Sequence, residues 1–302
     1  MPQEQICFLW VPCFTLFREL SECKINAWIL PWLFLDAKRL VQPPLITLTT
    51  DFGVSSPYVA AMKGVIYSIH PEARLVDLTH TIPPQNVHQA AIVLNETAFW
   101  FPPKTLHVAV VDPGVGTNRQ IIYTEIGNHA FLGPDNGLFG RLAHEASPTT
   151  IIAVTECAHW LPQISKTFHG RDIMAAVAAR LSLGLDPRRL GPTVDQMTML
   201  SWPEVVVSDR SIAGRVESID SFGNLITDID QATLASVPRG ESTIITCDEH
   251  ETRGIFNTYA DQPEMTLIAL VGSSGKLELA IVNESAAMML GVKAGTAVKI
   301  SW

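Results

Sequence analysis

The chain has 302 residues, of which 47% are hydrophobic and 17% charged, and this composition excludes a disordered protein because it can bury a substantial core. The formal net charge is −9, and no stretch is rich in lysine and arginine, so we expect no nucleic-acid partner. The five cysteines include no CxxC pair. That spacing excludes the usual zinc and disulfide frameworks and predicts a reducing, cytoplasmic location.

Residues 1–43 stand apart from the rest of the chain. They hold two apolar bursts, 7–17 and 27–35, and each burst is too short to span a bilayer. The start, Met-Pro-Gln-Glu, lacks the basic region of a signal peptide. We therefore predict an N-terminal extension without a catalytic role, either poorly ordered, interfacial or non-native, and no membrane-spanning segment.

From residue 45 onward, strand patterns alternate with helical patterns. A β-rich run at 45–50 is followed by helical spacing at 58–69, a strand at 74–78 and a helix at 86–100. The continuous apolar run at 106–111 is typical of a strand buried on both faces, and further strands are predicted at 121–125, 130–132 and 151–154, with a helix at 171–183. This alternation predicts an α/β domain with a largely parallel sheet over residues 44–192.

The pattern of predicted secondary structure changes after a segment rich in glycine and proline at 190–203, which we interpret as a linker. Short strand patterns follow at 205–207, 213–219, 225–229, 242–247, 265–271 and 277–282, separated by turn residues. The spacing predicts an all-β domain, a small barrel, over residues 204–302.

Four polar clusters follow predicted strands, and their aspartates are Asp51, Asp77, Asp112 and Asp135. One aspartate after a strand is commonly a turn former, but ligands of open α/β sheets bind where parallel strands end, so we expect the four to meet at one site.

A fifth cluster, residues 168–172, comes just before a helix. In it Asp172 is either a helix cap or part of a site, and His169 is either a loop histidine or a functional one. The segment 114–116 lacks the third glycine of a dinucleotide loop, there is no Walker loop, and no spacing marks a metal site. The residues alone therefore predict an α/β enzyme with an Asp/His/Arg site and no metal.

Taken together, six motifs resemble one family closely. In chain order they are TTDFG, DLTH, VVDPGVGTNR, PDNG, FHGRD and IDSFGNLITDI. They resemble the SAM hydroxide adenosyltransferases, relatives of the adenosyl chlorinase and fluorinase, and the resemblance covers residues 45–302. It implies an N-terminal α/β domain, a C-terminal barrel, and hydrolysis of S-adenosyl-L-methionine (SAM) to adenosine and methionine without a cofactor. It also implies a homotrimer whose active sites lie between subunits.

The hydrolases of this family hold and activate water with an Asp-Arg-His trio, which the motifs match to Asp112, Arg119 and His169. The halogenases carry a tyrosine where Asp112 stands, and the fluorinase has a serine near Gly170. The resemblance therefore implies the hydrolase, not the halogenase.

The same resemblance implies a set of substrate-binding residues. Asp51 matches the aspartate that binds the ribose hydroxyls, as a carboxylate accepting two hydroxyl hydrogen bonds can. Asp220 and Asn224 match residues that bind the methionine part of SAM, and Phe222 matches a residue near the adenine. Ser273 and Ser274 would lie near the methionine carboxylate, although the halogenases have an arginine in that turn and this chain does not. The strand from Leu277 to Ala280 would bind adenine through its backbone.

Three alternatives to hydrolysis stay open at this point: a non-catalytic protein that binds SAM or adenosine, an adenosyl halogenase, and a metal hydrolase unrelated to SAM.

Overall fold

The computed structural model describes residues 44–302; the predicted extension, 1–43, lies outside the described residues. The first part of the described chain builds a six-stranded sheet. Its strands are β1 (Leu45–Thr50), β2 (Arg74–Thr79), β3 (Leu106–Val110), β4 (Ile121–Ile126), β5 (His129–Pro134) and β6 (Thr150–Ala153). Their order is β2-β1-β3-β5-β4-β6, with parallel pairing from β2 to β5 and antiparallel pairing of β4 with both its neighbours. The predicted α/β class with a largely parallel sheet is confirmed, with β4 running against the other strands.

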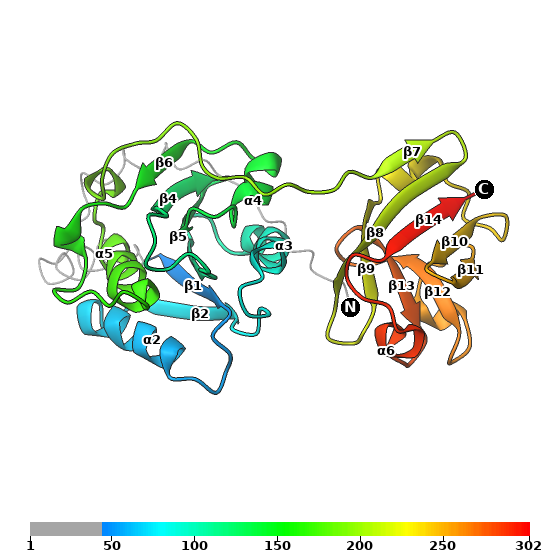
Figure 1. The fold of residues 1–302 in the computed structure, drawn as a ribbon, viewed down its shortest axis with the longest axis horizontal. Helices are drawn as coiled ribbons and strands as arrows, with labels where there is room; N and C mark the ends of the chain where they lie inside the picture. The colour runs from blue at the N-terminus through cyan, green and yellow to red at the C-terminus, as the bar shows by residue number, and fades with distance from the viewer. Residues whose placement is uncertain (1–43) are drawn as a thin grey trace, which may run out of the picture. The chain divides into compact units, whose positions relative to one another are not determined.

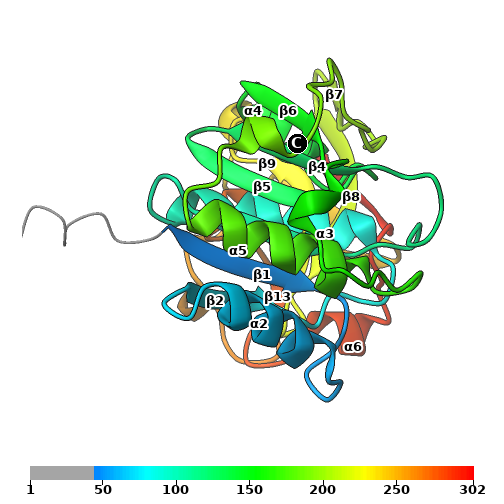
Figure 2. The same cartoon turned by 90° about the vertical axis from the view of Figure 1, so that its left-hand side faces the viewer.

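Helices cover both faces of this sheet. Helices α2 (Tyr58–Ile69) and α5 (Ala176–Ser182) share one hydrophobic cluster with the sheet, while α3 (Val87–Thr97) and α4 (Gly140–Glu145) share another. Figure 2 shows α2 and α5 in front of the sheet and α3 behind it. Because both faces are covered, β1 and β3 are buried along almost their whole length, as the apolar run of β3 predicts.

Two predicted helices differ from the observed ones. The segment predicted as one helix at 86–100 is an α-helix that begins after Asn86, whose side chain accepts from the Gln89 N–H, and a 3-10 turn (Ala98–Trp100). The helix predicted at 171–183 begins instead as a π-helix (Gly170–Ala175) and continues as α5. A π-turn is rare and is frequently found at functional sites.

The second part of the chain forms an eight-stranded antiparallel sheet (Figure 1). Its strands are β7 (Val206–Ser208), β8 (Ser211–Ile219), β9 (Leu225–Asp230), β10 (Ile244–Cys247), β11 (His250–Arg253), β12 (Leu267–Val271), β13 (Lys276–Ile281) and β14 (Ala297–Ser301). The order is β11-β10-β14-β8-β9-β13-β12, with β7 beside β8. The Thr252 hydroxyl donates to the Leu267 carbonyl at 2.7 Å and so links the two outermost strands. The sheet is a nearly closed barrel, as predicted, with one short helix, α6 (Ala286–Leu290).

Each sheet has its own hydrophobic core. The clusters around the first sheet draw on residues between 46 and 197, and those of the barrel on residues between 205 and 302. The domain boundaries predicted at 192 and 204 stay predictions. Among residues 44–302, no helix is long and apolar enough to cross a membrane.

Candidate active site

The carboxyl ends of β1 and β3 carry two aspartates that share a cavity of about 350 Å³. Asp51 follows β1, Asp112 follows β3, and both line this cavity together with His169. The other two predicted aspartates do not line it, which corrects the expectation that all four meet at one site. Asp77 is paired with Lys63 at 2.6 Å, and the Asp135 carboxylate accepts from the backbone N–H of Thr198 at 2.7 Å.

The three residues predicted to activate water are joined by hydrogen bonds. The Nε of Arg119 lies 2.9 Å from each carboxylate oxygen of Asp112, and its Nη2 contacts the same carboxylate. The same Nη2 lies 2.9 Å from Nδ1 of His169. Both members of the Asp112–Arg119 pair are nearly buried, with side-chain exposures of 6% and 11%. One guanidinium therefore orients both the carboxylate and the imidazole.

The contact with Arg119 fixes the form of the His169 ring. A guanidinium can only donate hydrogen bonds, so Nδ1 of His169 must accept and the neutral ring carries its proton on Nε2. Burial and the charge of Arg119 lower the pKa of His169, against weaker opposing effects of Asp112 and Asp172. Geometry and electrostatics agree on a neutral ring whose Nε2–H is free to donate.

Two glycines let the loops of this site come together. Gly116 has φ +79°, and a Cβ there would lie 2.5 Å from the Lys166 carbonyl oxygen. A Cβ on Gly170 would lie 2.9 Å from Val110 in β3, so a side chain would push the His169 segment away from the strand that carries Asp112. The close packing that forms the trio depends on both glycines.

Two side chains, Asp172 and Asn136, hold the loops on either side of the trio. The sequence alone did not reveal these roles. Asp172 lies inside the first turn of the π-helix and does not cap it; its carboxylate accepts from the Ser165 N–H at 2.7 Å and from Arg171. Asn136 donates from Nδ2 to the carbonyl of Val111, the residue before Asp112, at 2.9 Å. The PDNG motif thus supports the site by holding the backbone beside Asp112.

Asp51 lines the cavity, and one of its carboxylate oxygens already accepts a hydrogen bond. Its Oδ2 accepts from the backbone N–H of Gln85 at 2.8 Å. Beside it, the rings of Phe52, Tyr58 and Phe168 pack edge to face or tilted, with centroids 5.1 to 5.6 Å apart. An aromatic wall beside a carboxylate suits a sugar with an attached base, and the ribose-binding role of Asp51 stays a prediction.

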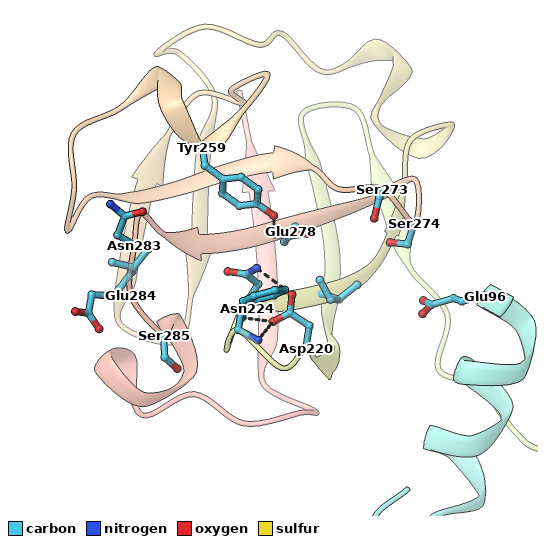
Figure 3. Close-up of a pocket in the computed structure, with 13 residues that line it drawn as sticks. Glu96, Asp220, Asn224, Tyr259, Ser273, Ser274, Glu278, Asn283, Glu284 and Ser285 are labelled. Atoms are coloured by element: carbon cyan, nitrogen blue, oxygen red, sulfur yellow. Dashed lines mark hydrogen bonds between the residues drawn. The ribbon is translucent and has the colours of Figure 1, made fainter. Parts of the chain in front are cut away.

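A second, larger cavity of about 710 Å³ lies in the barrel (Figure 3). Five of the predicted substrate-binding residues line it: Asp220, Phe222, Asn224, Ser273 and Ser274. The first three belong to the β8–β9 connection and the serines to the β12–β13 turn, so two segments about 50 residues apart meet as predicted. This cavity shares no lining residue with the cavity of Asp51, Asp112 and His169.

The β8–β9 turn is organised by Asp220. Its Oδ1 accepts from the backbone N–H groups of Phe222 and Asn224, and its Oδ2 accepts from the Asn224 side chain at 2.9 Å (Figure 3). Asn224 is buried as a result, while the ring of Phe222 is 77% exposed. An exposed phenylalanine at the mouth of a cavity is available to stack on a ligand.

Leu277 and Ala280 do not line either cavity. Both are fully buried in β13, which is paired with β9 on one side and β12 on the other, and the Leu277 carbonyl accepts from Thr227. The residues of β13 that line the cavity are Glu278 and Ile281, and the segment after β13 adds Asn283 and Ser285. Adenine binding by the β13 backbone stays a prediction.

Two further residues of the larger cavity were missed from the sequence, Tyr259 and Glu278. Glu278 is 5% exposed and accepts a hydrogen bond from the Tyr259 hydroxyl. A glutamate inside the apolar run of a strand, in LELAI, is the one signal that could have identified it. Among the described residues, no group of three or more His, Cys, Asp or Glu is placed to hold a metal ion.

Comparison with known proteins agrees with this arrangement over most of the described chain. Residues 46–191 match the SAM hydroxide adenosyltransferase N-terminal domain, and residues 214–299 match the C-terminal domain of the same family. A solved structure from Thermotoga maritima, described as an uncharacterized conserved protein, superposes with a TM-score of 0.81 at 33% identity. It covers 85% of this chain and 100% of that one.

Curated relatives point the same way. The chain is 35% identical to the (R)-S-adenosyl-L-methionine hydrolase of Salinispora arenicola, covering 87% of this chain and 99% of that protein. It is 37% identical to the hydrolase of the same name from Thermus thermophilus, covering 83% and 97%. Identity to the fluorinase of Nocardia brasiliensis is 26%, covering 85% and 96%. With both family domains matched in order, the chain belongs to the SAM hydroxide adenosyltransferase family.

Proposed function

We propose that this chain hydrolyses SAM to adenosine and L-methionine, with water attacking the ribose C5′ in line with the sulfonium. The observation that carries the proposal is the hydrogen-bonded trio Asp112–Arg119–His169, of which Asp112 and His169 line one cavity with Asp51. The relatives named as SAM hydrolases are 35–37% identical to this chain, and the fluorinase is 26% identical. Position 112 is an aspartate, whereas the halogenases that the sequence motifs also resemble carry a tyrosine there.

The trio is arranged to hold one water molecule. His169 donates from Nε2 to the water oxygen, and Asp112 accepts the proton that the water loses as the bond to C5′ forms. Arg119 keeps the imidazole neutral and stabilises the hydroxide character that develops on the water oxygen. Water has a pKa near 15.7, so hydroxide character must be stabilised where it develops.

The bond changes balance without a further reactant. The C5′–O bond forms while the C5′–S bond breaks, and its electron pair neutralises the sulfonium to give methionine. Because opposite charges disappear as the bond forms, a cavity with little water favours the transition state over the separated ions. Holding oxygen, carbon and sulfur in line contributes several kcal/mol more.

The proposal is tested by incubating the purified chain with SAM and following adenosine and methionine by chromatography. The curated relatives carry the (R) descriptor, so the two sulfonium epimers are supplied separately, each with and without EDTA and added chloride. We expect equimolar adenosine and methionine, insensitive to EDTA, and no product from the Asp112→Ala variant. SAM binding without product would instead indicate a binding protein, and a chlorinated nucleoside would indicate a halogenase.

We also propose that the working enzyme is a homotrimer in which a second copy completes each site. Asp112 and His169 line one cavity and the residues expected to bind methionine line another, with no lining residue in common, yet both sets must contact one SAM molecule. Light scattering after gel filtration measures the subunit number. Mixing the Asp112→Ala and Asn224→Ala variants after partial denaturation tests the shared site: recovery of activity is expected only if one site draws on two copies.

A further inference from the structure

The barrel contributes three carboxylates to the larger cavity, Asp220, Glu278 and Glu284, and Glu284 is exposed. The other two, Asp220 and Glu278, differ in how many hydrogen bonds they can still accept from a ligand. Asp220 accepts three hydrogen bonds, all from its own turn, so its oxygens mainly hold Phe222 and Asn224 in place. Glu278 accepts one hydrogen bond, at Oε1, from the Tyr259 hydroxyl (Figure 3). Among residues 44–302, Oε2 of Glu278 accepts none. A carboxylate offers about four acceptor positions, so Glu278 is the one with capacity to spare.

The fold keeps the Glu278 carboxylate buried and in place. The side chain is 5% exposed, and it projects from β13, which is paired on both sides. Opposite it, Gly272 leaves room: a Cβ at this position would lie 2.4 Å from Oε2. Tyr259 holds one oxygen and the missing Cβ of Gly272 leaves space for the other, so the carboxylate is oriented before any ligand arrives.

The surroundings favour a cation at this point. No lysine, arginine or histidine lines the cavity, so no basic side chain of its lining balances the carboxylate. Burial raises the pKa of Glu278, and the negative charge of Asp220 adds to this, against the opposing hydrogen bond from Tyr259. A bound cation would relieve both unfavourable effects, and a buried charge is stable only when it is paired and hydrogen-bonded.

We propose that Glu278 binds the α-ammonium group of the methionine half of SAM and thereby selects substrates that carry it; this inference rests on the proposed function. The sulfonium has no N–H to donate, and the adenine amino group is neutral. The α-ammonium group alone combines a full positive charge with three donors, as a buried, half-occupied carboxylate requires. Tyr259 acts through Glu278 as a positioning residue.

The test compares three substrates that differ only at the amino-acid end. They are SAM, its deamino analogue without the α-amino group, and decarboxylated SAM, which keeps the amine. The variants are Glu278→Gln, which keeps the shape and removes the charge, and Tyr259→Phe. Glu251→Gln is the matched control, because Glu251 is an exposed barrel glutamate paired with Arg253 and lines neither cavity.

For the unmodified protein we expect kcat/KM to fall about tenfold or more on the deamino analogue, the scale of one charge-assisted hydrogen bond. It should fall less on decarboxylated SAM. In Glu278→Gln, KM for SAM should rise by about tenfold with kcat nearly unchanged, and the preference for SAM over the deamino analogue should disappear. Tyr259→Phe should raise KM by a smaller factor in the same direction, and Glu251→Gln should match the unmodified protein.

The proposal is overturned if Glu278→Gln, shown to be folded by its thermal melting, still prefers SAM over the deamino analogue as the unmodified protein does. Calorimetric titration of the same three compounds makes the comparison without turnover. If the unmodified protein yields no adenosine from SAM, the proposed function fails. The titrations with Glu278→Gln then still show whether Glu278 binds the ammonium group.

Discussion

Acidification should destabilise this fold through a histidine inside the first sheet. His107, on β3, is fully buried; its Nδ1 lies 2.8 Å from the Thr47 hydroxyl and its Nε2 lies 3.2 Å from Nδ1 of His129. Its ring also stacks on Phe131 with centroids 5.0 Å apart. Burial, assisted by His129, lowers the pKa of His107 to about 3.

The direction and size of the effect follow from linkage. The pKa in the folded state lies below the unfolded value of about 6.5, so acid protonates the unfolded chain first and stability is lost as the pH falls below that value. At pH about 5 an unfolded histidine is almost fully protonated and His107 almost not at all. The difference of about 1.5 pH units corresponds to about 2 kcal/mol of unfolding free energy.

The assay is urea unfolding of the unmodified protein and the His107→Asn variant, at pH about 7.5 and about 5 and at one protein concentration. Asparagine keeps a polar group near Thr47 and does not titrate. We expect the unmodified protein to lose about 2 kcal/mol more than the variant between the two pH values. Equal losses in the two proteins would refute the reasoning, because the acid sensitivity would then come from other groups.

Three further predictions concern the two cavities. Replacing Arg119 with lysine removes the fork that holds both Asp112 and His169, so kcat should fall by about 10²- to 10³-fold, measured at saturating SAM. Because burial and Arg119 lower the pKa of His169, kcat/KM should be constant near neutral pH and fall only below pH 6.5; an acid limb centred above 6.5 would contradict this. Replacing Gly272 with alanine displaces the flexible end of Glu278 rather than backbone, so KM for SAM should rise while the melting temperature changes little.

The central strands of the first sheet could be predicted because they are buried on both faces, whereas the edge strand β2 is largely exposed. A continuous apolar run such as β3, and the stop of α2 before Pro71, are visible in the sequence without any tertiary information. The π-turn after His169 is not visible in this way, since it results from the close approach of Gly170 to Val110 in another element. Strands β11 and β14 were missed; β14 alternates between exposed and buried residues and carried a usable signal.

The sequence motifs singled out Asp112, Arg119 and His169, and the structure joins these three residues by hydrogen bonds, while their role in activating water stays a prediction. Spacing along the chain did not reveal that Asp77 and Asp135 bind other parts of the fold, nor that Asp220 is occupied by its own turn. Such partners are set by which loops the finished fold brings together.

The separate linings of the two cavities have a consequence for how such proteins diverge. Residues of the trio are supported by one hydrophobic core, and residues expected to bind the amino-acid end of the substrate by another. Substitutions at distant sites that share no contacts usually have additive effects. If the two proposals hold, a lineage can change which sulfonium compound it accepts through mutations around Glu278 without first disturbing the trio proposed to activate water, and it can change the attacking nucleophile while keeping its substrate.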